Sequence, residues 1–97
     1  DVFVVDTAGG DSARDLSVEL RRSGIAAERA FDGRSMKSQM KSADRSGAAF
    51  VLIVGTDELA DGTVTVRHMV GDHEQTRVER TAVVATVAAL LDDLTLT

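Results

Sequence analysis

The feature that most constrains the fold is an unbroken apolar run at residues 48–54, Ala-Ala-Phe-Val-Leu-Ile-Val. A strand with one solvated face alternates apolar and polar residues, whereas this run places apolar side chains on both faces. We therefore expect the central strand of a sheet that is covered on both sides. A second short apolar run, Val2–Val5, is rich in β-branched residues and predicts another buried strand.

Two segments with helical character lie between these strands. The first runs from about residue 11 to Gly24, and the second runs from Ser35, a natural N-cap, to Gly47. Residues 25–30 lie between the two helices and are a weaker strand candidate. The N-terminal half therefore predicts the order βαβαβ, which implies a parallel sheet with right-handed crossovers.

The C-terminal half predicts a change from parallel to antiparallel pairing. Residues 55–61 look like a connection with a short helical turn. Residues 63–68 alternate strictly and indicate a half-exposed strand, and residues 74–78 are its hairpin partner. Thr81 can cap a last helix at about 82–93. The complete order predicts a three-layer α/β/α fold, with a five-stranded mixed sheet and helices on both faces.

Length and composition limit the class of protein. The chain has 97 residues, and we expect a single domain over residues 1–97. A hydrophobic fraction of 43% and a charged fraction of 28% exclude a disordered chain. The sequence has no cysteine, which excludes disulfides, a thiol nucleophile and a cysteine zinc site, and we expect a cytoplasmic protein. No apolar run approaches the ~20 residues of a membrane span, so we expect no membrane partner. The abrupt apolar start after Asp1 indicates a fragment of a longer chain.

The charge of the chain is unevenly distributed. The formal net charge is −5, yet residues 33–47 hold four basic side chains and one acidic side chain. These cations recur every three or four residues along the second helix and form a stripe: Arg34, Lys37, Lys41 and Arg45. The stripe is either an ordinary solvated face or a row of phosphate or base contacts, and its confinement to one segment of an acidic chain favours the second interpretation. Aromatic residues make up 3% of the chain, so a base-stacking platform is not expected.

The same helix carries a family resemblance. Residues 33–48, Gly-Arg-Ser-Met-Lys-Ser-Gln-Met-Lys-Ser-Ala-Asp-Arg-Ser-Gly-Ala, closely resemble the anticodon-binding domain of histidyl-tRNA synthetases, which are class II enzymes. Residues 20–25, 50–55, 57–59 and 62–67 agree with this resemblance, which covers almost the whole chain. The resemblance implies a five-stranded mixed sheet with one antiparallel strand.

The resemblance also implies a partner and candidate contact residues. The partner would be the anticodon stem-loop of histidine tRNA. The four cations of the stripe, Arg34, Lys37, Lys41 and Arg45, become candidates for backbone or base contacts. Glu28 or Asp32 would accept hydrogen bonds from base amino groups, and Arg67 is a further candidate.

The resemblance implies a binding function rather than catalysis for this chain. Nothing in the sequence resembles the class II signature motifs, which we expect N-terminal to Asp1. We therefore expect no catalytic residue, no metal site and no cofactor here. The parent enzyme would use ATP and Mg²⁺ to join histidine to its tRNA, and it would be a homodimer.

Other interpretations carry less support. Gly9-Gly10 precedes a helix but belongs to no phosphate-binding motif, and His68 and His73 have no standard metal-ligand spacing. The competing hypothesis is a regulatory or protein-interaction module that keeps this fold without binding tRNA. The net negative charge and the scarcity of aromatic residues favour that alternative.

Overall fold

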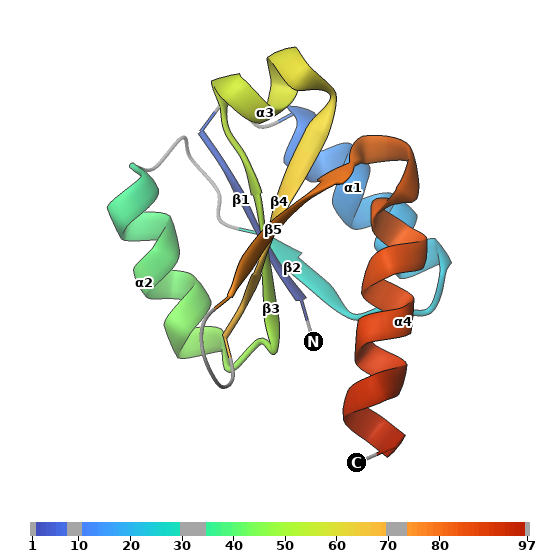
Figure 1. Cartoon of the computed structure of the whole chain (residues 1–97). Coiled ribbons are helices and arrows are strands. Elements are labelled where there is room, and N and C mark those ends of the chain that lie inside the picture. Colours follow the sequence, from blue (N-terminus) through green and yellow to red (C-terminus); the bar gives the residue numbers. More distant parts are fainter. Residues whose placement is uncertain (1, 8–10, 30–34, 70–73, 97) are drawn as a thin grey trace.

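The computed structural model describes residues 2–7, 11–29, 35–69 and 74–96. Its elements along the chain are β1 (Val2–Asp6), α1 (Asp11–Arg22), β2 (Ala27–Arg29), α2 (Met36–Ser46), β3 (Phe50–Val54), α3 (Thr56–Asp61), β4 (Thr63–His68), β5 (Gln75–Glu79), a 3₁₀ turn (Arg80–Ala82) and α4 (Val83–Leu96). The predicted order of elements is therefore confirmed (Figure 1).

The strands form one sheet in the order β2-β1-β3-β4-β5. Strands β2, β1 and β3 are parallel, and β4 is antiparallel to both of its neighbours, β3 and β5. Four strands thus run in one direction and β4 runs in the other. This is the mixed sheet with one antiparallel strand that the sequence analysis predicted.

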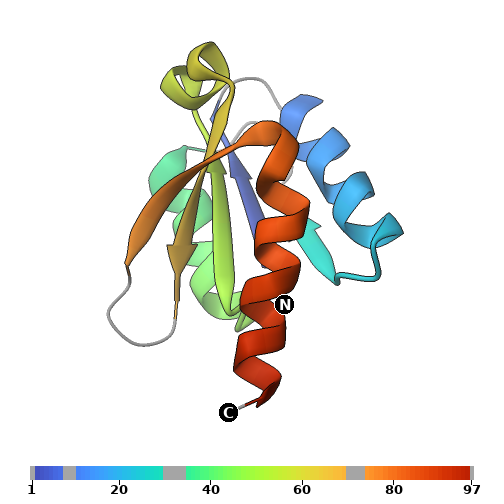
Figure 2. The ribbon, with the colours of Figure 1, turned by 45° about the vertical axis from the view of Figure 1, so that its right-hand side comes forward.

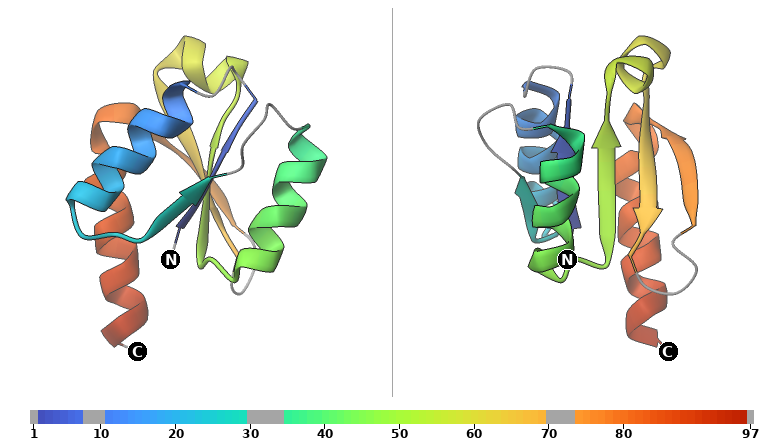
Figure 3. Two further views of the ribbon diagram at one scale, coloured as in Figure 1. Left: turned by 180° about the vertical axis from the view of Figure 1, so that it is seen from behind. Right: turned by 90° about the vertical axis from the view of Figure 1, so that its left-hand side faces the viewer.

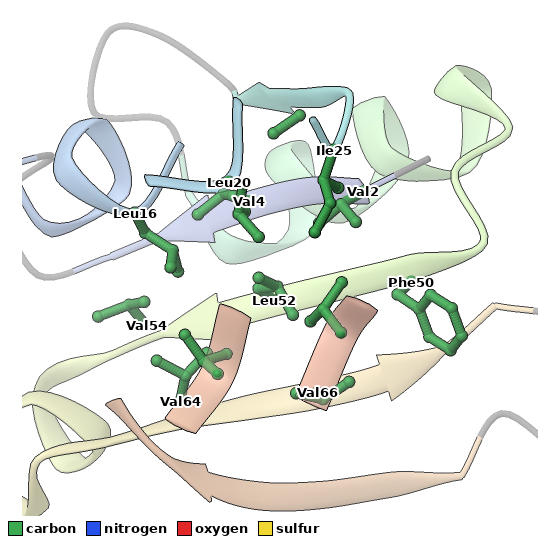
Figure 4. Close-up of a cluster of buried hydrophobic side chains, with 13 residues drawn as sticks. Val2, Val4, Leu16, Leu20, Ile25, Phe50, Leu52, Val54, Val64 and Val66 are labelled. Carbon is green, nitrogen blue, oxygen red and sulfur yellow. The ribbon is translucent and has the colours of Figure 1, made fainter. Parts of the chain in front are cut away.

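Helices cover both faces of the sheet. Helices α1 and α4 lie side by side on one face, and α2 lies on the other (Figures 1 and 2). Beneath α1 and α4 is the larger core cluster, in which Leu16 and Leu20 of α1 meet Leu52 of the central strand (Figure 4). The smaller cluster lies beneath α2 and includes Phe3, Val51 and Ala43. All five residues of β1 and all five of β3 are buried, as expected for strands covered on both faces.

Local signals set the two ends of α2. The Ser35 hydroxyl accepts a hydrogen bond from the Ser38 N–H at 3.2 Å, as an N-cap does. At the other end Gly47 adopts φ 71°, the left-handed conformation that glycine reaches without steric cost. Both caps were predicted from the residue types.

Two predicted boundaries are wrong. Strand β2 covers three residues rather than 25–30, because the Ile25 N–H bonds to the Leu20 carbonyl and completes the end of α1. Thr81 does not cap α4, since it lies inside the 3₁₀ turn that precedes the helix. The Arg80 backbone N–H fixes that turn by bonding to the Gly62 carbonyl at 2.9 Å.

Candidate nucleic-acid interface

On the α2 side of the sheet, no helix of the described residues covers the half formed by β4 and β5. Helix α2 packs against β1, and β4 and β5 lie beyond its edge (Figure 3, right). The register aligns residues across the sheet on this side, in the rows Phe3–Val51–Arg67–Gln75 and Val5–Ile53–Thr65–Arg77. Each row is apolar beneath α2 and becomes polar on β4 and β5. We refer to the polar part, Thr65, Arg67, Gln75 and Arg77, as the open sheet face.

A hollow of about 400 Å³ lies on the open sheet face. Its volume falls in the range of pockets that take small ligands. The lining comes from β3, α3, β4 and β5 and consists of Ile53, Glu58, Thr65, Gln75, Thr76 and Arg77. The hollow therefore combines an apolar floor with a carboxylate, a guanidinium, an amide and hydroxyl groups.

Glu58 is the most unusual residue of this hollow. It is 8% exposed, and its Oε2 atom is buried with no hydrogen-bond partner among the described residues. Gly55 makes room for the carboxylate, because a Cβ atom at this position would lie 3.2 Å from Oε1 of Glu58. Burying a carboxylate without a partner is costly, so such a group is an exception that calls for an explanation. Glu58 thus brings to the hollow a carboxylate whose hydrogen bonds the described residues leave incomplete.

Arg67 lies on the same face as the hollow. It is half-buried on β4, opposite Val51 on one side and Gln75 on the other. Its Nε atom is buried and has no acceptor in the described part of the chain. The sequence analysis ranked Arg67 behind the helical cations, whereas the structure places it beside the hollow.

The helical cations occupy a separate surface. Lys37, Lys41 and Arg45 are all exposed on α2, and no ion pair to them occurs within the described residues. Helical geometry places them on the side opposite Gln39 and Ala43, which are buried against the sheet. The cations therefore point to solvent rather than into the hollow. Arg34, the first member of the predicted stripe, lies outside the described residues.

The acidic candidates are not brought together with Arg67. Glu28 is exposed on β2 and aligned with Phe3, so it belongs to the α2 side of the sheet. Strands β1 and β3 separate it from β4, a distance of about 14 Å at the usual strand spacing. Asp32 lies outside the described residues. Glu58 is therefore the acidic residue that the structure places at the hollow.

The position of α2 depends on a buried side chain, Gln39, that the sequence analysis did not identify. Gln39 is 2% exposed, and its Oε1 accepts the Asp6 N–H at 2.9 Å while its Nε2 donates to the Asp6 carbonyl at 2.8 Å. Met40, the next residue of the helix, is half-buried against the smaller cluster. The side chain of Met36 lies outside the described set. Gln39 thus fixes α2 to the end of β1.

The described residues contain no group of three potential metal ligands. No described helix is long and apolar enough to cross a membrane.

Comparison with known proteins decides the family. The family model described as "Anticodon binding domain" matches residues 1–90. The chain belongs to the anticodon-binding domain family. This agrees with the resemblance found in residues 33–48.

The curated relatives of this anticodon-binding domain are histidine–tRNA ligases. It is 45% identical over 75 residues to the histidine–tRNA ligase of Solidesulfovibrio magneticus, with 77% of this chain and 18% of the relative aligned. Identity to the Geobacillus thermodenitrificans enzyme is 48% over 82 residues, covering 80% of this chain and 18% of the relative. The chain thus spans about a fifth of the length of these relatives.

A solved structure agrees in both sequence and fold. The apo histidyl-tRNA synthetase of S. aureus superposes with a TM-score of 0.79 at 34% identity. The match covers 89% of this chain and 25% of the synthetase chain. The predicted fold class is confirmed by this likeness and by the sheet order.

Proposed function

We propose that this anticodon-binding domain binds the anticodon stem-loop of histidine tRNA and reads a loop base in the hollow of the open sheet face. The observation that carries the proposal is Glu58 at the wall of that hollow, whose buried Oε2 atom has no hydrogen-bond partner among the described residues. Family membership supports the class of partner. The histidine–tRNA ligases among its relatives support the choice of tRNA.

The chemistry of the hollow suits an unstacked base. A carboxylate accepts hydrogen bonds, so Glu58 would pair with an exocyclic amino group of guanine, adenine or cytosine. Arg67 donates and the Gln75 amide both donates and accepts, which complements the carbonyl and ring-nitrogen atoms of a base edge. Single-stranded loops expose these edges, whereas a helical RNA stem conceals them.

The exposed cations of α2 would perform a different task. Lys37, Lys41 and Arg45 project to solvent from a helix on the same side of the sheet as the hollow. Phosphate contacts set the position of a nucleic acid, and base contacts provide specificity. We assign the first role to the helix and the second to the open sheet face. Arg34, Asp32 and Glu28 remain predicted contacts.

We assign catalysis to the rest of a longer parent enzyme. In that proposal the parent is a cytoplasmic homodimer that joins histidine to its tRNA with ATP and Mg²⁺. Residues 1–97 form one binding domain that takes no part in the chemical step. We place the ATP and Mg²⁺ site in the rest of the parent, together with the chemical step.

The proposal is tested by titrating the chain with histidine tRNA and with the same tRNA carrying a swapped anticodon, each at two salt concentrations. We expect tighter binding of the native anticodon and weaker binding at higher salt. The variant Glu58→Gln keeps the size of the side chain but replaces an acceptor oxygen by a donor, and it should remove the preference for the native anticodon. Asp57→Asn is the matched control, since Asp57 is exposed on the same helix.

Two results would contradict the proposal. If Glu58→Gln kept the full anticodon preference, the hollow would not be the reading site. If neither tRNA bound at low salt, the titration would be repeated with the full-length parent. Absence of binding there as well would favour the protein-interaction module.

A further inference from the structure

Arg77 is a cation that the stripe on α2 does not include. It lies on β5, the edge strand of the sheet, directly opposite Thr65, and it lines the hollow with Glu58 and Gln75. Arg67 is opposite Gln75, so Arg67 and Arg77 are diagonal neighbours on one face of the β4–β5 pair. Diagonal neighbours lie about 7–8 Å apart, within reach of long side chains. Two guanidinium groups are therefore concentrated at this hollow.

Arg77 is held at the rim by an acidic partner. Its Nη1 atom lies 3.0 Å from Oδ2 of Asp61, the last residue of α3. The two side chains are 51% and 60% exposed, so water and salt screen the attraction between them. Exposed pairs of this kind are weak and exchange readily. The guanidinium can therefore leave Asp61 for another anion at small cost.

A phosphate is a better partner for Arg77 than a single carboxylate oxygen. Guanidinium groups bind phosphate through two parallel hydrogen bonds, whereas the pair with Asp61 uses a single Nη1–Oδ2 contact. A base inserted into the hollow would bring its own phosphate to the rim. We propose that Arg77 binds an RNA phosphate at the rim of the hollow and that Asp61 holds this arginine until the RNA displaces it.

This inference deepens the proposed function and rests on it. It assigns Arg77 to the RNA-binding surface and gives Asp61 an antagonistic role, because the carboxylate must release the arginine before the phosphate binds. Removing the carboxylate should therefore strengthen RNA binding, and the gain should exist only while Arg77 is present. General repulsion between an acidic residue and RNA would not depend on Arg77.

The test is a double-mutant cycle on the chain, with the anticodon stem-loop of histidine tRNA as the probe. Asp61→Asn should tighten binding ~1.4–5-fold at low salt, the range that follows from the strength of exposed ion pairs, about 0.2–1 kcal/mol. Arg77→Ala should weaken binding. It should also make the negative slope of log affinity against log salt less steep by about 0.7. In the Arg77→Ala background, Asp61→Asn should have no effect. Both positions are exposed, and circular dichroism verifies that each variant is folded.

Two controls separate the possible explanations. Asp57→Asn removes the same charge from another exposed position of α3, whereas the ion pair of Arg77 is with Asp61. This control should leave affinity nearly unchanged. If Asp57→Asn raised RNA affinity as much as Asp61→Asn does, the inference would be overturned and general repulsion between acidic residues and RNA would be indicated. If Arg77→Ala bound like the parent chain while Arg67→Ala bound more weakly, the role of Arg77 would be refuted and the proposed function would stand. If no form of the chain bound the probe at low salt, the cycle would be repeated in the full-length parent, and absence of binding there as well would overturn both proposals.

Discussion

Replacing Gln39 by methionine tests the attachment of α2 to the sheet. The Val2 N–H bonds to the Ala26 carbonyl, which shows the side of β1 that faces β2. The described part of β2 ends at Arg29, which is paired with Val4. At Asp6, the Gln39 amide accepts from the backbone N–H and donates to the backbone carbonyl. It thus makes the two hydrogen bonds that the backbone of a neighbouring strand would make. Methionine fills a similar volume but forms neither hydrogen bond.

The magnitude follows from the two lost hydrogen bonds. A buried polar group that loses its partner costs about 1–3 kcal/mol, so Gln39→Met should lower the free energy of unfolding by ~2–5 kcal/mol. Domains of this size are stable by about 5–15 kcal/mol. At ~4–8 °C per kcal/mol, the melting temperature should fall by roughly 8–40 °C.

Thermal and urea unfolding followed by circular dichroism measure this loss. Gln75→Met is the matched control, because it makes the same chemical change at an exposed position of β5. We expect the control to alter stability by less than about 0.5 kcal/mol. If Gln39→Met and Gln75→Met had the same melting temperature and the same urea midpoint, the reasoning would be refuted, since the two hydrogen bonds would then contribute nothing to stability.

Two further predictions concern the RNA surface. Gly55→Ala should weaken tRNA binding, because the added Cβ would lie 3.2 Å from Oε1 of Glu58 and displace the carboxylate. The backbone of Gly55 has φ −105°, which suits alanine, so stability should change by less than about 1 kcal/mol. Unchanged affinity in the tRNA titration would contradict this role of Gly55. Lys37→Ala and Lys41→Ala should each make the negative slope of log affinity against log salt less steep by about 0.7. Both side chains are exposed, so the stability of each variant should stay within about 0.5 kcal/mol of the parent. An unchanged slope in both variants would move the phosphate contacts to another face.

The sequence was sufficient for the architecture because its strongest signals are local. Ser35 and Gly47 mark the ends of α2 through their own hydrogen-bonding and backbone preferences. The apolar runs of β1 and β3 require cover on both faces, and the alternation of residues 63–68 sets the two faces of β4. Each signal lies within a few residues of the feature it determines.

Gln39 and Glu58 were missed because polarity alone predicts exposure. Gln39 stands four residues before the buried Ala43 and so belongs to the inner side of α2, but its burial depends on the hydrogen bonds that it makes to Asp6 at the end of β1. The burial of Glu58 depends on the space left by Gly55 at the end of β3. A glycine directly after a buried strand, followed three residues later by an acid, was the available signal. Both environments arise from strand order, which no single segment encodes.

The order of strands in the sheet also has a consequence for how the domain folds. Strands β3, β4 and β5 are neighbours both in sequence and in the sheet, so residues 50–79 form a meander with short connections. Strands β2, β1 and β3 require two helical crossovers, and such distant pairings are slow because the chain must close long loops first. Glu58, Arg67, Gln75 and Arg77 all belong to the local meander. The hollow is therefore built from strands that are consecutive along the chain, and the slower parallel pairing brings α2 and its cations to that surface.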